Sequence, residues 1–146
     1  MKVYFDNAAS TKILPASAEK MVEVLTDYYA NPGASSVMGM EADNILKDSA
    51  KILARLINCT ENEIYFTSGG TEGDNWAIFG TAEGYIRSGK HMVTTAIEHP
   101  AVSKPFAALE EKGWEVTYLP VDEKGYVSTD DIKNAVREDT VLVSII

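Results

Sequence analysis

Apolar residues recur along the chain with two different periods, which predict alternating helices and strands. A spacing of three to four residues predicts helices at 15–29, 42–57, 71–87, 100–112 and 130–137. Short apolar runs between them predict strands at 3–5, 63–67, 91–96, 115–119 and 140–146. The last run, "TVLVSII", is apolar along nearly its whole length, as in a strand that is buried on both faces.

Turn-forming residues separate these elements and indicate the fold class. The stretch "NPGASSVMGM" at 31–40 is typical of a loop, and residues 122–125 are typical of a turn. Pro100 suits the first position of a helix, and Pro105 lies near enough to that start for its missing N–H to matter little. Strands that alternate with helices imply right-handed crossovers and an α/β fold with a mostly parallel sheet.

The chain stops inside its last apolar run, at Ile146. Ligands of parallel sheets bind beyond the carboxyl ends of the strands, and the loop that would follow this strand is missing. We therefore expect residues 1–146 to form a single incomplete domain. Its open sheet edges would favour self-association, so we expect a homo-oligomer.

Charge and composition narrow the classes of function. The net charge of −9 at pH 7 disfavours binding to nucleic acid, and no apolar run approaches the roughly 20 residues of a membrane span. Cys59 is the only cysteine, which excludes an internal disulfide and fits a cytoplasmic location. With only two histidines, the chain lacks the spacing of a zinc site, and we expect no metal.

The turn "TSGGT" at 67–71 stands between a predicted strand and a predicted helix, where a phosphate is commonly held. Glycines let the backbone approach an anion closely, and the first turn of a helix offers unpaired N–H groups to it. The turn lacks a P-loop lysine and the spacing G-x-G-x-x-G, which favours a single phosphate over a nucleotide. Alternatively, the turn only caps the helix, with Glu72 and Asp74 complementing its dipole.

Four motifs carry a resemblance to a known family. The segments "YFDNAASTKILP", "FTSGGTEGDNWAI", "TTAIEHPAV" and "GYVSTDDI" follow in the order and spacing of cysteine desulfurases. The chain resembles the NifS/IscS-like members of the class V aminotransferase family, which are fold-type I enzymes that use pyridoxal 5′-phosphate. The resemblance runs along essentially all 146 residues. It implies that the chain is a truncated piece of the large domain of that fold.

The resemblance also assigns roles to residues. Gly70 and Thr71 match the turn that holds the cofactor phosphate. His99 matches the histidine that stacks on the pyridine ring and takes part in proton transfer, for which an imidazole is suited. Asn7 matches a segment near the active site and would hydrogen-bond in the substrate pocket, unless it is only a turn residue that closes the first predicted strand.

The single cysteine and the second histidine are interpreted as residues without a catalytic role. The family's nucleophilic cysteine lies far downstream, so Cys59 is interpreted as a small structural residue. His91 is interpreted as structural or solvent-facing. Ser36 falls where relatives have a histidine in the loop at 31–39, and Asp74 replaces an asparagine of the family motif.

The groups that complete the chemistry are expected beyond Ile146. Pyridoxal enzymes need a lysine for the Schiff base and an acid beside the pyridine nitrogen, and no lysine of this chain lies in a matching context. We therefore expect the isolated chain to be inactive. The full-length enzyme would act on L-cysteine, pass sulfur to an acceptor protein and serve a pathway such as iron–sulfur cluster assembly.

Three alternatives remain open at this point. The chain could belong to another class V enzyme, such as an aminotransferase or a selenocysteine lyase. It could be a non-catalytic paralogue that acts as a binding module. A flavodoxin-like or nucleotide-binding domain would fit the alternation of elements, but no motif supports it.

Overall fold

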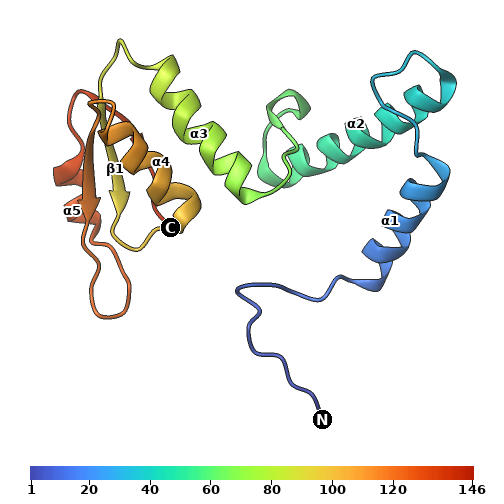
Figure 1. Ribbon diagram of the computed structural model, residues 1–146, viewed down its shortest axis with the longest axis horizontal. Helices are drawn as coiled ribbons and strands as arrows, with labels where there is room; N and C mark the ends of the chain where they lie inside the picture. Colours follow the sequence, from blue (N-terminus) through green and yellow to red (C-terminus); the bar gives the residue numbers. More distant parts are fainter. The chain divides into compact units, whose positions relative to one another are not determined.

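The computed structural model describes residues 1–146, and the contacts divide them into two compact units (Figure 1). The first unit comprises residues 1–65 and the second comprises residues 66–146. The expectation of a single incomplete domain stays a prediction, and each unit is described by itself.

The first unit is helical. It consists of α1 (Pro15–Asp27), α2 (Val37–Ile57) and the short 3₁₀ helix η1 (Glu61–Glu63). Pro15 occupies the start of α1, where its missing N–H removes no helical bond. Apolar side chains of α1 and α2 line a common groove, and small residues such as Ala50 and Ala54 are buried on α2.

Two predicted strands are absent. Residues 3–5 and 64–67 have no regular secondary structure, and residue 63 ends η1. A strand is stable only when a neighbouring strand accepts and donates its backbone hydrogen bonds. Neither segment has such a neighbour, because the sheet contains only strands from residue 91 onward.

The loop predicted at 31–40 is shorter than expected, because α2 already begins at Val37. Ser36 caps this helix, and its Oγ accepts the N–H of Gly39 at 3.1 Å. A Cβ atom at Gly39 would lie 2.5 Å from the carbonyl oxygen of Ala34, so only glycine allows this close approach. Ser36 is therefore a helix cap.

We expect Ser36→Ala to lower the free energy of unfolding of the first unit by about 1 kcal/mol. The reason is that the N–H of Gly39 loses its acceptor at a part-buried helix end. Urea unfolding followed by circular dichroism measures this loss. Ser36→Asp restores a capping oxygen and should recover most of the stability, whereas equal losses in both variants would contradict the capping role.

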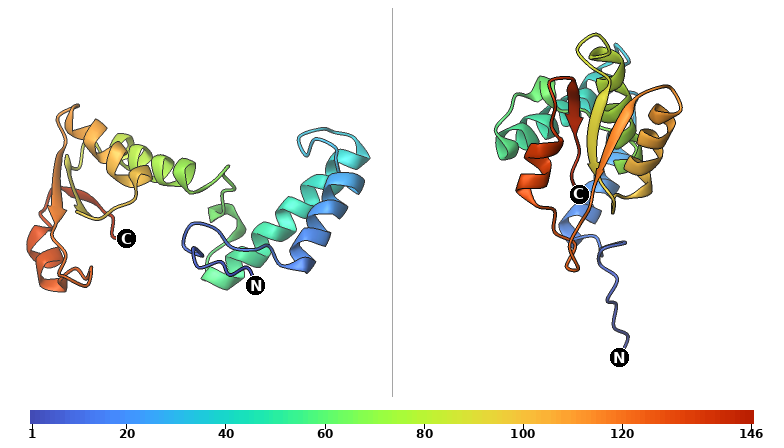
Figure 2. Two further views of the ribbon diagram at one scale, coloured as in Figure 1. Left: turned by 60° about the horizontal axis from the view of Figure 1, so that its bottom comes forward. Right: turned by 90° about the vertical axis from the view of Figure 1, so that its left-hand side faces the viewer.

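The second unit has the predicted α/β alternation (Figures 1 and 2). In chain order its elements are α3 (Gly70–Gly84), β1 (His91–Thr95), α4 (Pro100–Glu110), β2 (Glu115–Leu119), α5 (Thr129–Ala135) and β3 (Thr140–Val143). The strands lie in the order β2-β1-β3, and both neighbours of β1 are parallel to it. This confirms the predicted parallel sheet.

The core of the second unit lies between β1 and the two helices α3 and α4. Met92 and Phe106 are fully buried there, and Ile78, Leu109 and Trp114 pack against the same cluster. Burying side chains of this size supplies about 1.5–3 kcal/mol each. The position of α3 and α4 follows from this packing, and so does the position of their amino-terminal turns.

Two details of the second unit differ from the sequence prediction. The strand predicted at 140–146 ends at Val143 and is only half-buried, because β3 is an edge strand with a single neighbour. Pro105 is the sixth residue of α4, which places it deeper in the helix than the sequence interpretation assumed. No helix of either unit combines the length and the apolar character of a membrane span.

Candidate functional site

The glycine turn before α3 presents two unpaired backbone N–H groups. The carbonyl oxygen of Gly69 accepts the N–H groups of Glu72 and Gly73 at 3.1 and 3.2 Å. The N–H groups of Gly70 and Thr71 have no acceptor within the protein. They lie at the positive end of the helix dipole, which favours an anion.

The space in front of this turn is open. A Cβ atom added at Gly69 or Gly70 would meet no other atom within 4 Å. Residues 68–70 are also exposed, so an anion can approach the turn from solvent. These observations fit the phosphate-binding role that the resemblance implies for Gly70 and Thr71.

Glu72 is turned back onto the loop. Its carboxylate accepts the N–H of Ser68 at 2.6 Å, and this hydrogen bond keeps the pKa of Glu72 below its usual value. This contact stabilises the loop before α3 and leaves the neighbouring N–H groups of Gly70 and Thr71 without an acceptor. The alternative that the turn only caps the helix stays a prediction. Asp74 does not line the pocket described below.

His99 caps α4 with its side chain. Nδ1 accepts the N–H of Ala101 at 3.0 Å, so Nε2 carries the proton when the imidazole is neutral. The ring is exposed and Nε2 has no partner within the protein. The histidine thus combines a fixed orientation with one nitrogen that is free for proton exchange.

Thr71 and His99 line the same pocket, where the amino-terminal turns of α3 and α4 meet. The pocket has a volume of about 290 Å³ and is also lined by Asn75, Ala101 and Lys104. Lys104 is its only charged side chain. Two helix amino termini and one lysine make this pocket attractive to an anion, in an otherwise acidic chain.

The pocket lies next to the carboxyl ends of the strands, where parallel sheets bind ligands. Ala96, directly after β1, donates its N–H to the carbonyl of Leu119 at the end of β2. Glu98 accepts hydrogen bonds from the Thr95 hydroxyl at 2.8 Å and from the N–H of Ile146 at 3.0 Å. The segment that carries His99 is therefore tied to the ends of β1 and β2 and to the residues that follow β3.

The structure places the remaining candidate residues as follows. Asn7 lies in an exposed turn of the first unit, in which Ala9 and Ser10 donate to the carbonyl of Asp6. Asn7 thus lies in a turn, but the strand that this turn was expected to close is absent, and the role of Asn7 in a substrate pocket stays a prediction. Cys59 is partly exposed just after α2, with no bond to another cysteine.

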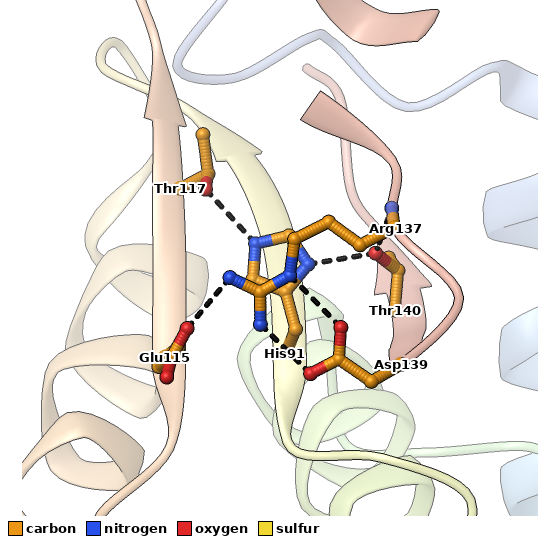
Figure 3. Close-up of polar contacts among 6 residues, drawn as sticks. All are labelled: His91, Glu115, Thr117, Arg137, Asp139 and Thr140. Atoms are coloured by element: carbon orange, nitrogen blue, oxygen red, sulfur yellow. Dashed lines mark hydrogen bonds and ion pairs between the residues drawn. The ribbon is translucent and has the colours of Figure 1, made fainter. Parts of the chain in front are cut away.

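His91 is structural, and the solvent-facing alternative is wrong because its side chain is fully buried. It opens β1, and its ring nitrogens contact the hydroxyls of Thr140 at 2.7 Å and Thr117 at 2.9 Å (Figure 3). Arg137 lies beside it in ion pairs with Glu115 and Asp139. We call these six residues the strand clasp, because they join the amino ends of the three strands.

Asn75 and Lys104 line the pocket but were missed by the sequence interpretation. A signal for Asn75 existed, since it follows Thr71 by four residues and shares its face of the helix. Lys104 had no comparable signal, because its position depends on how α4 packs against α3.

Comparison with known proteins identifies the family. Residues 3–146 match the model of class-V aminotransferases, and the chain therefore belongs to this family. It is 46% identical over 143 residues to cysteine desulfurase IscS of Methanosarcina thermophila, covering 98% of this chain and 35% of that protein. It is 45% identical over 143 residues to a NifS/IcsS protein homolog of Lactobacillus delbrueckii subsp. bulgaricus, covering 98% of this chain and 37% of that protein.

Solved structures agree with these sequence matches. A NifS-like protein superposes with a TM-score of 0.94 at 37% identity, covering 99% of this chain and 40% of that one. A structure described as SspA in complex with cysteine gives a TM-score of 0.90 at 35% identity, covering 97% of this chain and 41% of that one. The predicted family and fold are confirmed, and the chain spans well under half the length of these relatives.

Proposed function

We propose that this chain supplies the phosphate-binding turn and the ring-stacking histidine of a pyridoxal 5′-phosphate-dependent cysteine desulfurase. The observation that carries the proposal is the pocket lined by both Thr71 and His99, next to a turn in which the N–H groups of Gly70 and Thr71 have no acceptor. Enzymes of the class V family use this cofactor, and a related structure is described as a complex with cysteine.

Different residues of the pocket would bind the phosphate and the pyridine ring of the cofactor. The N–H groups of Gly70 and Thr71 and the Thr71 hydroxyl would hold the phosphate. The imidazole of His99 would pack against the ring of the cofactor, and its Nε2 would exchange a proton with the substrate. When bound, the cofactor supplies an electron sink for bond cleavage at the amino acid.

The remaining parts of the proposal concern the complete enzyme. The Schiff-base lysine and the nucleophilic cysteine are assigned to sequence beyond Ile146, so the isolated chain should not turn over cysteine. L-cysteine is the proposed substrate, with Asn7 contributing to its pocket, and an acceptor protein receives the sulfur. The half-exposed edge strand β3 supports a homo-oligomer, and the lone cysteine supports a cytoplasmic location.

The phosphate turn can be tested with a pair of variants at one position. Gly70→Pro removes one N–H donor at the first position of α3, where proline suits a helix. Gly70→Ala keeps that N–H and has open space for its methyl group. We expect Gly70→Pro to bind pyridoxine 5′-phosphate about tenfold more weakly than Gly70→Ala, as befits one hydrogen bond to a charged group.

Isothermal titration calorimetry measures this ratio. Pyridoxine 5′-phosphate carries an alcohol in place of the aldehyde, so it forms no imine with surface lysines. His99→Ala should also weaken its binding, about five- to tenfold, because one face of the ring loses its cover. Equal affinities of the Gly70→Pro and Gly70→Ala variants would overturn the phosphate role, and absence of saturable binding to the unaltered chain would overturn the proposal as a whole.

A further inference from the structure

Pro105 leaves a buried carbonyl group without its helical partner. In an α-helix the carbonyl of residue 101 accepts the N–H of residue 105, but proline has no N–H. Ala101 lies in the first turn of α4 and is only 7% exposed. A buried carbonyl without a donor is costly, so another group must satisfy it.

Asn75 of the neighbouring helix supplies the missing donor. Its Nδ2 donates to the carbonyl oxygen of Ala101 at 3.2 Å and to that of Thr71 at 2.8 Å. Both partners are carbonyl oxygens, so the amide nitrogen and not the amide oxygen must face them. The two amide hydrogens are thereby both used, and one side chain joins the first turns of α3 and α4.

This link connects the two halves of the candidate pocket. Thr71 belongs to the phosphate turn, while Ala101 donates its own N–H to Nδ1 of His99 at 3.0 Å. The connection therefore runs from the Thr71 carbonyl through Asn75 and Ala101 to the imidazole. We propose that Asn75 is a positioning residue that sets His99 at the correct distance from the phosphate turn, for a ligand that joins a phosphate to a flat ring.

The proposal rests on the proposed function, and it requires the asparagine amide in particular. Aspartate at position 75 would place a carboxylate against two carbonyl oxygens, which repel it. Alanine would leave the Ala101 carbonyl without a donor. Pro105→Ala returns an N–H to the helix, so it satisfies that carbonyl without joining α3 to α4.

The first experiment is a double-mutant cycle of thermal stability with Asn75→Ala and Pro105→Ala. With Pro105 present, Asn75→Ala should lower the melting temperature by about 5 °C more than it does in the Pro105→Ala background. The physical reason is that the carbonyl of Ala101 lacks a hydrogen-bond donor only when Pro105 is present and the amide of Asn75 has been removed. Equal shifts in both backgrounds would show that Asn75 does not compensate for Pro105.

The second experiment separates positioning from simple stabilisation. It compares Pro105→Ala with the double variant Asn75→Ala/Pro105→Ala, in which the carbonyl is satisfied in both cases. We expect the double variant to bind pyridoxine 5′-phosphate about five- to tenfold more weakly, while its affinity for inorganic phosphate changes less than about twofold. Inorganic phosphate needs only the turn of α3, whereas the larger probe needs His99 as well.

Each outcome has a distinct meaning. Equal affinities of the two proteins for pyridoxine 5′-phosphate would overturn the positioning role and leave Asn75 as a structural donor only. If the unaltered chain binds the probe to no measurable extent, the proposed function fails, and the positioning role is then decided by the NMR signal of the His99 ring Cε1–H. That signal should shift between Pro105→Ala and the double variant, and an unchanged signal would overturn the inference.

Discussion

Replacing Gly89 with alanine is expected to destabilise the second unit by about 3 kcal/mol. Gly89 precedes β1, and a Cβ atom there would collide with the backbone of Asp139, including its carbonyl oxygen and carbonyl carbon. Asp139 has little freedom to retreat. Its carbonyl accepts the N–H of His91 at 3.2 Å, and its carboxylate forms a two-pronged ion pair with Arg137.

Thermal unfolding of the purified variant measures this effect, and the melting temperature should fall by roughly 15 °C. Gly80→Ala is the matched control, since Gly80 lies inside α3 and a Cβ atom there meets nothing within 4 Å. Alanine is the better helix former, so this control should gain about 0.5–1 kcal/mol. Equal losses in the two variants would show that steric contact with Asp139 is not the cause.

The sequence was sufficient for the elements of the second unit because their apolar periodicity matches their packing. Ile78 and Ala82 of α3, and Phe106 and Leu109 of α4, recur at helical spacing and are buried in the common core. The strands predicted at 3–5 and 63–67 failed for the opposite reason. A short apolar run indicates only that its side chains favour a buried position. A strand also needs a neighbouring strand for its backbone hydrogen bonds, and a local sequence pattern does not show whether one is present.

The candidate site was predictable only where its residues belong to motifs. Gly70, Thr71 and His99 were found through the resemblance, and the structure places Thr71 and His99 on one pocket. Asn75 was overlooked because its importance arises from Pro105, a residue 30 positions away on another helix. The sequence places Pro105 near a helix start, where it looks harmless, and only the packing of α3 on α4 reveals that Asn75 satisfies the carbonyl that it leaves unpaired.

The contacts within the strand clasp could not be predicted from the sequence, because its residues lie far apart along the chain. His91, Thr117 and Arg137 come from three separate segments that only the parallel register brings together (Figure 3). The clasp lies at the amino ends of the strands, whereas the pocket lies near their carboxyl ends. Its role is therefore structural, and its test is a measurement of stability.

His91→Leu is expected to lower the free energy of unfolding by about 2–3 kcal/mol at pH 8. Leucine fills a similar volume, so the loss arises chiefly from the hydroxyls of Thr117 and Thr140, which lose their ring partners. The neutral imidazole satisfies both hydroxyls because it donates from one nitrogen and accepts at the other. Urea unfolding measures the change.

His91→Leu should also change how the free energy of unfolding depends on pH. Burial and, next, the nearby charge of Arg137 lower the pKa of His91 in the folded chain, while Asp139 and Glu115 oppose this more weakly. In the unfolded chain the pKa returns to about 6.5, so the unfolded state binds a proton that the folded state rejects. The contribution of His91 is therefore complete above that pH and declines as the pH falls below it.

The carboxylate of Asp139 does not mask this decline. Arg137 keeps the pKa of Asp139 below its usual acidic value, so that group changes its charge only at a lower pH. Stability of the unaltered chain should thus fall between about pH 7 and pH 5, and His91→Leu should remove most of this slope. His99→Asn is the control, because it changes the only other histidine and keeps a helix-capping side chain. If the slope persists in His91→Leu to the same extent as in His99→Asn, the buried imidazole does not govern acid stability.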